Sequence, residues 1–307
     1  MANKRIEVSE NQLFLPMNLP EQPKEKELLF KPIQRPVWTE NKAKLIERYL
    51  YLFVLVTKHG TYIDGFAGPQ EPNKPEMWAA KLVLDTEPKW MRHFFLYDQD
   101  SNKCAMLEEL KKCQPSLDSK GRKIVRNVEV RCGDFNEIVN DLLNSNCIRQ
   151  KEATFCLLDQ RTFECKWSTV KALAEYKDNR HNKIELFYFL PNSWQDRALA
   201  ALKINKNLAS EWWGGSDADT LFTMGQNQRR DLLCERFKTE LGYKYVTPWA
   251  IYEKSKGCGQ IMYYMLHATD YDEAPLLMQR AYYHAVVPKD ECQQQSFSFM
   301  ESFTATA

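Results

Sequence analysis

Short apolar segments alternate with amphipathic segments between residues 38 and 190. Their composition and length predict strands over residues 61–64, 92–97, 128–132, 154–158 and 184–190. Helical spacing of apolar positions predicts helices over residues 77–85, 101–114, 135–144 and 167–177. A further helix is expected before the first strand, with Thr39 as its N-cap and Gly60 as its C-cap. This strand–helix alternation predicts a parallel sheet with helices on both faces.

The last third of the chain breaks the alternation. A helix is expected over residues 226–241, followed by strands over 244–252 and 260–268 and a closing helix over 273–286. The short connection between the two strands implies that they pair antiparallel. A mostly parallel sheet with an antiparallel end strand predicts the methyltransferase variant of the Rossmann-like doubly wound α/β fold, and it fits a dehydrogenase less well.

Four segments follow from this pattern. We expect a proline-containing extended arm over residues 1–37 and a Rossmann-like core over 38–225. Residues 226–290 then form either a winged-helix-like unit or a completion of the sheet, and 291–307 form a tail.

Composition narrows the class of protein without naming it. The chain has 307 residues, of which 44% are hydrophobic and 27% charged, and its formal net charge is +1. Such a charge argues against avid nonspecific binding of nucleic acid, but a local basic face is compatible with it. The histidines and cysteines lack metal-ligand spacing, so no metal site is expected. No signal peptide or membrane-spanning segment is evident, and we expect a cytoplasmic protein without a membrane partner.

A glycine loop follows the first predicted strand. Asp64 ends that strand, and Gly65, Phe66, Ala67 and Gly68 form the loop. Ligands of doubly wound folds bind at the carboxyl ends of the strands, and glycines let the backbone approach a ligand closely. The spacing differs from the dinucleotide-binding pattern. We expect the loop to contact a ligand and Asp64 to accept a hydrogen bond from a cationic amino group, and an ordinary glycine turn is the alternative.

Acidic residues also end the next strands. Asp98 follows the second strand and is placed to bind ribose hydroxyls. After the third strand, Asp134 is placed to accept from an adenine amino group and Phe135 to stack on the ring. Both aspartates are equally explained as helix N-caps, because aspartate favours that position.

The fourth strand ends at Asp159, the candidate for a catalytic carboxylate or one that orients the substrate. The alternative is a carboxylate that bonds backbone amides. Trp212 and Trp213 are a candidate exposed platform for a flipped base, and core packing is the competing interpretation.

Several blocks resemble one family, the three-Cys-motif partner (TcmP) methyltransferase-like proteins. The resemblance covers residues 38–286, and its most specific block runs from Tyr62 to Pro69, Tyr-Ile-Asp-Gly-Phe-Ala-Gly-Pro. Supporting blocks are Trp38 with Lys42, Tyr49 and Leu50, then Leu158 to Trp167, then Met262 to Thr269. The resemblance implies a core that binds S-adenosylmethionine, a winged-helix-like C-terminal element, and a protein partner with a three-cysteine motif. The resemblance does not settle the substrate, for which we expect nucleic acid.

Three departures from the family pattern keep a second function open. Gln70 replaces a glycine, the bulky Met77 and Trp78 replace a small Gly-Ser pair, and Gln160, Arg161 and Thr162 stand where the family favours a proline and later a glycine. The leading hypothesis is a methyltransferase that uses S-adenosylmethionine and acts on nucleic acid. The alternative is a catalytically degenerate binding module that serves as a scaffold in a multiprotein assembly, such as one of phage defence.

Overall fold

The computed structural model describes residues 37–192, 206–215, 217–254 and 257–286. The arm expected over 1–37 and the tail expected over 291–307 lie outside these residues, except for Val37. The helices are α1 (Val37–Thr57), η1 (Pro75–Met77), α2 (Ala79–Asp85), α3 (Ser101–Lys112), α4 (Phe135–Asn144), α5 (Trp167–Glu175), α7 (Lys206–Trp213), η2 (Ala218–Phe222), α8 (Gln226–Thr239) and α9 (Ala274–Ala285).

One seven-stranded sheet organises the fold. Its strands are β1 (Thr61–Asp64), β2 (His93–Asp98), β3 (Asn127–Cys132), β4 (Thr154–Leu158), β5 (Glu185–Pro191), β6 (Tyr245–Lys254) and β7 (Cys258–Thr269). Their order is β3-β2-β1-β4-β5-β7-β6. Strands β1 to β5 are parallel, and β7 is antiparallel to both β5 and β6. This is the Rossmann-like sheet of class I methyltransferases, and the predicted fold class is confirmed.

The register aligns the parallel strands at both ends. Thr61 lies opposite His93 of β2 and Thr154 of β4, and His93 lies opposite Asn127 of β3. The first residues of four strands therefore meet at one edge of the sheet, and the loops that follow them meet at the other edge. We call these the amino edge and the carboxyl edge.

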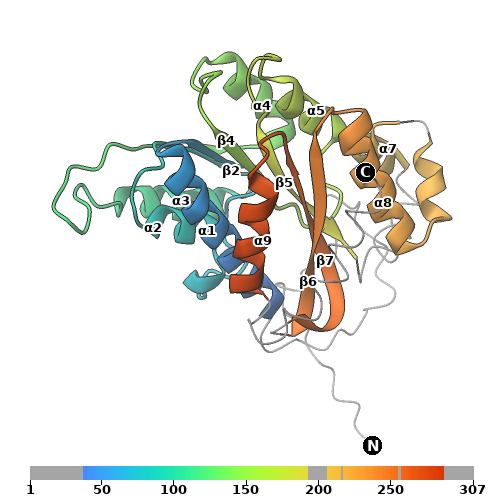
Figure 1. Cartoon of the computed structure of the whole chain (residues 1–307), viewed down its shortest axis with the longest axis horizontal. Coiled ribbons are helices and arrows are strands. Elements are labelled where there is room, and N and C mark those ends of the chain that lie inside the picture. Colours follow the sequence, from blue (N-terminus) through green and yellow to red (C-terminus); the bar gives the residue numbers. More distant parts are fainter. Residues whose placement is uncertain (1–36, 193–205, 216, 255–256, 287–307) are drawn as a thin grey trace, which may run out of the picture.

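Helices cover both faces of the sheet. Figure 1 shows α1 and α9 packed together on one face, while α4, α5, α7 and α8 lie on the other. The strands β6 and β7 complete the sheet and do not form a separate winged-helix unit.

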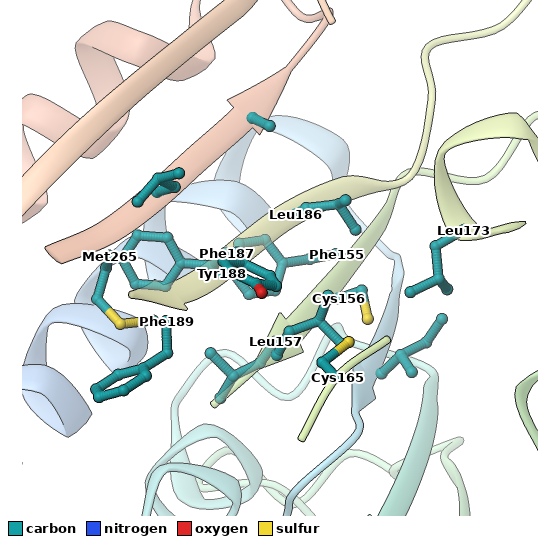
Figure 2. Packing of buried hydrophobic residues seen from close by; sticks show 14 of the residues in the cluster. Phe155, Cys156, Leu157, Cys165, Leu173, Leu186, Phe187, Tyr188, Phe189 and Met265 are labelled. Atoms are coloured by element: carbon teal, nitrogen blue, oxygen red, sulfur yellow. The ribbon is translucent and has the colours of Figure 1, made fainter. Parts of the chain in front are cut away.

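The core lies between these layers, around β4, β5 and β7. Figure 2 shows Phe155 and Leu157 of β4 beside Phe187 of β5, with Met265 of β7 next to them. All four side chains are fully buried. The strands are apolar on both faces because helices cover both, as the continuous apolar segments of the sequence indicate.

Three local predictions are wrong. The first helix begins at Val37, so Thr39 lies inside its first turn and is not the N-cap. That helix ends at Thr57, so Gly60 is not its C-cap. Lys58 takes the left-handed conformation (φ 63°) that is common after the end of a helix. The helix expected over 77–85 is divided into η1 and α2, with Trp78 between them.

Candidate functional site

A pocket of about 200 Å³ lies at the carboxyl edge, where the loops after β1, β2, β3 and β4 meet. It gathers most of the side chains predicted from the strand ends. The lining residues are Gly65, Phe66, Gly68, Gln70, Asp98, Gln99, Lys103, Gly133, Asp134, Phe135, Asn136, Asp159, Arg161, Glu164, Lys166, Leu208 and Glu211. Ala67 and Asp64 are absent from this lining.

The glycine loop approaches its neighbours too closely for any side chain at two positions. A Cβ atom at Gly65 would lie 2.6 Å from the ring of Phe135. At Gly68 it would lie 2.4 Å from Asp98 Oδ2 and 2.6 Å from Cβ of Lys103. Backbone hydrogen bonds hold the loop here, including one of 2.7 Å from Ala67 N to Tyr97 O. Glycine is therefore required by packing at both positions.

Asp64 lies beneath this loop, and its residue is only 1% exposed. Its carboxylate accepts hydrogen bonds from Tyr62 Oη at 2.8 Å and from Phe66 N at 3.1 Å. Burial raises the pKa of Asp64 to about 7, although both hydrogen bonds oppose this shift. Asp64 therefore positions the loop from below, where the sequence pointed to direct contact with a cationic ligand.

Asp98 lines the pocket at the end of β2. Its carboxylate accepts from Gly68 N at 3.0 Å and from Asp100 N at 2.9 Å, and Lys103 Nζ lies 3.8 Å from Oδ2. Burial lowers the pKa of Lys103, and the charge of Asp98 opposes that shift. The cap of α3 is Asp100, so Asp98 does not serve as a helix cap.

Asp134 and Phe135 lie at the start of α4. Asp134 is the N-cap, and its carboxylate accepts from Asn136 N at 2.9 Å, as the capping alternative predicts. Phe135 is 2% exposed, and the centroid of its ring lies 5.1 Å from the centroid of the Tyr97 ring. Both residues still border the pocket, but the ring of Phe135 lies against Gly65 and presents little free face.

Asp159 forms the most buried ion pair of the pocket, with Lys42 of α1. The distance from Lys42 Nζ to Asp159 Oδ2 is 2.5 Å, and the two side chains are 4% and 11% exposed. Within the described residues, Asp159 Oδ1 is buried and has no hydrogen-bond partner. Because buried carboxylate oxygens are normally satisfied, this oxygen requires a donor that the described residues do not supply.

Lys42 is one of the residues that carry the family resemblance, but the sequence alone does not indicate that it belongs to the site. The signal was present in the spacing, because Lys42 precedes Tyr49 by seven residues and so shares its buried helical face. A lysine on an apolar helical face requires a partner, and Asp159 provides it.

Several further residues of the pocket have no role predicted from the sequence. The side-chain oxygen of Asn136 accepts hydrogen bonds from Lys166 N and from the Thr169 hydroxyl, both at 2.8 Å. These hydrogen bonds join α4 to α5. Glu164 accepts from Arg161 N at 2.7 Å, and burial raises the pKa of this carboxylate.

The residues that depart from the family pattern lie in different parts of the structure. Gln70 lines the pocket. Trp78 lies outside it and donates its indole N–H to Ala67 O at 2.7 Å, which fixes the glycine loop. Gln160 is fully buried, donates to Phe189 O at 3.1 Å and accepts from Cys165 N at 2.8 Å. Of the residues that depart from the family pattern, Gln70 and Arg161 line the pocket.

Trp212 and Trp213 do not form an exposed platform. They are 3% and 2% exposed, and Trp212 packs at 4.7 Å from Phe163, between ring centroids. The indole N–H of Trp213 donates to Asp217 at 3.0 Å. The two tryptophans are therefore packing residues, and they offer no exposed ring on which a flipped base could stack.

The charge of the pocket is predominantly acidic. Five carboxylates line it, on Asp98, Asp134, Asp159, Glu164 and Glu211, against the three lining cations Lys103, Arg161 and Lys166 and the cation of Lys42, which pairs with Asp159 and leaves an excess of one carboxylate. A concave site with such an excess favours a ligand that carries positive charge. In the described parts of the chain, no group of three or more His, Cys, Asp and Glu residues could hold a metal ion.

No protein-family model matches this chain, and no curated protein matches it. Two solved structures are similar in part. The DszA carbon methyltransferase is 13% identical, with a TM-score of 0.44, and the match covers 75% of this chain and 54% of that one. The small RNA methyltransferase HEN1 is 11% identical, with a TM-score of 0.45, and the match covers 83% of this chain and 28% of that one. The chain thus spans about half of the first structure and about a quarter of the second. The strand order and directions of the chain's own sheet carry the fold assignment.

The helices of the described segments include none that is both long and apolar enough to cross a membrane.

Proposed function

We propose that this chain is a methyltransferase that uses S-adenosylmethionine, as its resemblance to the TcmP family implies, and that it acts on nucleic acid. The observation that carries the proposal is the pocket at the carboxyl edge, whose lining combines a glycine loop, an excess of carboxylates and Asp159, one of whose oxygens is buried without a partner among the described residues. When bound, S-adenosylmethionine supplies an electrophilic methyl group on a positively charged sulfonium.

The residues present fit this cofactor in chemistry. The excess of carboxylates suits a ligand with sulfonium and ammonium charges, and the glycines leave backbone at the surface of the pocket. The volume of about 200 Å³ is below the roughly 300–1,000 Å³ usual for ligand pockets. The half-buried side chains of Gln70, Lys103 and Arg161 line the pocket, and their rotation would widen it.

Each lining group then has an assigned part. The backbone of Gly65 to Gly68 contacts the methionine portion, with Phe66 and Ala67 completing the loop and Asp64 supporting it from below. Asp98 binds the ribose hydroxyls after Lys103 moves aside, and Asp134 and Phe135 border the adenine. The positions at the strand ends and the lining of the pocket, which includes all of these residues except Asp64 and Ala67, support these assignments.

Asp159 orients the methyl acceptor. Lys42 holds Oδ2, which leaves Oδ1 to accept a hydrogen bond from the nucleophile. Alignment of the acceptor with the methyl group supplies most of the rate enhancement, because methyl transfer requires a linear approach of the reacting atoms. Lys42 acts through Asp159 and is a positioning residue.

A methyl-transfer assay tests the proposal. The full chain is incubated with S-adenosylmethionine labelled in its methyl group and with total RNA, fragmented DNA or bulk protein. We expect label in nucleic acid, reduced at least 100-fold by Asp159→Asn, with the Asp219→Asn variant outside the pocket as a control. Label in protein alone, or equal transfer by Asp159→Asn, would refute the function or the role of Asp159.

One observation favours the scaffold alternative. The carboxylate of Asp98 is already engaged by Gly68 N, Asp100 N and Lys103, and the ring of Phe135 is packed against Gly65. A chain without transferase activity would use this rigid core to bind a protein that carries a three-cysteine motif. Affinity purification of the full chain that recovers no such protein would count against this alternative.

A further inference from the structure

The starts of the strands carry charge opposite to their ends. Acidic residues are the last residues of β1 and β2 and follow β3 and β4, whereas basic residues precede β2, β3, β4 and β5. The basic residues are Arg92 before β2, Arg126 before β3, Arg149 and Lys151 before β4, and Lys183 before β5. Because the register aligns the strand starts, these side chains meet at the amino edge. A net charge of +1 for the whole chain conceals this separation of charge.

Two adjoining hollows make this edge concave. The larger is about 780 Å³ and is lined by His59, Arg92, His93, Val125, Arg126, Asn127, Arg149, Gln150, Lys151 and Glu152. The second is about 380 Å³, and its basic lining residues are Lys151, Lys177, Arg180, His181 and Lys183. They share Gln150, Lys151 and Glu152, so they form one continuous surface, which we call the basic surface.

The two carboxylates that line this surface are buried. Glu152 is 6% exposed and faces His59 at 3.5 Å. Glu185 is 6% exposed and accepts from Tyr49, from His267 at 2.8 Å and from Thr269 at 3.1 Å. Both carboxylates therefore lie beneath the surface, and an approaching anion would not contact them directly.

Not every cation of the surface is available. Arg126 donates to the carbonyl oxygens of Met91 at 3.2 Å and Leu84 at 2.7 Å, so it fastens the start of β3 to its neighbours. Arg180 pairs with Asp178 at 2.9 Å, and Lys177 donates to Glu152 O.

The side chains of Arg92, Arg149 and Lys151 are different. All three residues are exposed, and none forms an ion pair with any residue that the structure describes. Unpaired cations on the rims of a hollow are suited to phosphate groups, and arginine binds phosphate through two parallel hydrogen bonds.

We propose that the basic surface binds the phosphodiester backbone of single-stranded nucleic acid. A groove admits a flexible strand, whereas a lipid bilayer is flat and cannot enter it. The two hollows together offer several cations along one path, which a strand with regularly spaced phosphates can follow. The surface lies across the sheet from the acidic pocket, roughly 13–20 Å away for strands of this length.

As an anchor for the nucleic-acid acceptor, this surface rests on the proposed function. Binding is measured without S-adenosylmethionine, so that loss of the anchor and loss of methyl transfer are distinguishable. A chain that binds nucleic acid at this surface and transfers no methyl group would retain this inference and lose the proposed function.

The test uses the full chain and a fluorescein-labelled oligoribonucleotide of about 20 nucleotides in fluorescence anisotropy, repeated with single-stranded DNA of the same sequence. The variant Arg92→Gln/Arg149→Gln/Lys151→Gln removes three exposed cations. The control Lys44→Gln/Lys171→Gln/Lys254→Gln removes three exposed cations that line neither hollow.

We expect at least tenfold weaker binding by the first variant and less than twofold by the control. The slope of log K against log salt concentration should fall by about 2 in the first variant, since each single-strand phosphate contact contributes about 0.7. Equal loss in both variants would reduce the effect to total charge and overturn the proposal. Tighter binding of a duplex, or binding only to phosphatidylserine vesicles, would also overturn it.

Discussion

The buried pair of Lys42 and Asp159 gives the sharpest prediction about stability. Lys42→Met removes the cation and keeps an unbranched side chain of similar length. The pair has a separation of 2.5 Å between Nζ and Oδ2, with side chains 4% and 11% exposed. Removing one partner of a buried ion pair costs about 3–5 kcal/mol, because the other charge is left uncompensated.

The two single variants should differ in cost. In Lys42→Met, nothing in the described structure replaces the cation, since Asp159 Oδ1 already has no hydrogen-bond partner. In Asp159→Asn, Lys42 Nζ remains 5.9 Å from the ring centroid of Phe189 and 5.8 Å from that of Tyr263. Such contacts are worth about 0.5–2 kcal/mol, so we expect Asp159→Asn to cost about 2–4 kcal/mol and Lys42→Met to cost more.

Urea unfolding of both single variants and of Lys42→Met/Asp159→Asn measures the coupling. The double variant removes both charges, so it should be more stable than Lys42→Met alone, with a coupling energy of about 2–3 kcal/mol. The m-values should agree across the four proteins, which shows that the same transition is compared. Strictly additive effects, or a cost below about 1 kcal/mol for Lys42→Met, would refute the ion pair as described.

Three further predictions concern the residues around the pocket. Burial raises the pKa of Asp64 from 3.8 to about 7, so its contribution to stability is fully present below pH 3.8 and is lost as the pH rises through about 7. The free energy of unfolding should therefore fall over this window relative to that of Asp64→Asn, and parallel profiles would contradict the shift. Gly65→Ala places a Cβ atom 2.6 Å from the Phe135 ring and should lower stability by about 1–3 kcal/mol in urea unfolding, with partial recovery in Gly65→Ala/Phe135→Leu. Gln160→Leu removes the acceptor 2.8 Å from Cys165 N and should cost about 1–3 kcal/mol, measured as a lower urea midpoint; an unchanged midpoint would show that Gln160 is dispensable.

The strand ends were the most informative feature of the sequence. Apolar segments followed by acidic residues located Asp98, Asp134 and Asp159 at one edge, and all three border the pocket. This succeeds because parallel strands share their direction, so a position relative to the strand end converts directly into a position on the sheet.

Contacts between segments that are distant in the chain could not be predicted from the sequence. The pairing of Lys42 with Asp159 joins residues 117 positions apart, and the free oxygen of Asp159 is visible only in three dimensions. The burial of Trp212 likewise depends on Phe163, which lies in another segment of the chain. Composition describes a tryptophan pair as apolar, but the tertiary fold decides whether it is exposed.

The basic surface could have been found by the same reasoning applied to strand starts. Arg92, Arg149 and Lys151 precede apolar segments just as the aspartates follow them. Net charge concealed the pattern, because it sums the 42 basic and 41 acidic residues of the whole chain. Charge compared at the two ends of each strand is a better guide than charge summed over the chain.

Binding of S-adenosylmethionine to the full chain tests the central claim most directly. Isothermal titration calorimetry would compare S-adenosylmethionine and S-adenosylhomocysteine on the unaltered chain, Gly68→Ala and Gly225→Ala. A Cβ atom at Gly68 meets Asp98 Oδ2 at 2.4 Å, whereas at Gly225 the nearest atom is 3.6 Å away, which makes Gly225→Ala a matched control. We expect saturable binding at one site per chain, weakened at least tenfold by Gly68→Ala and unchanged by Gly225→Ala. Absence of binding at millimolar ligand, or equal affinity in all three proteins, would contradict the assignment of this pocket to the cofactor.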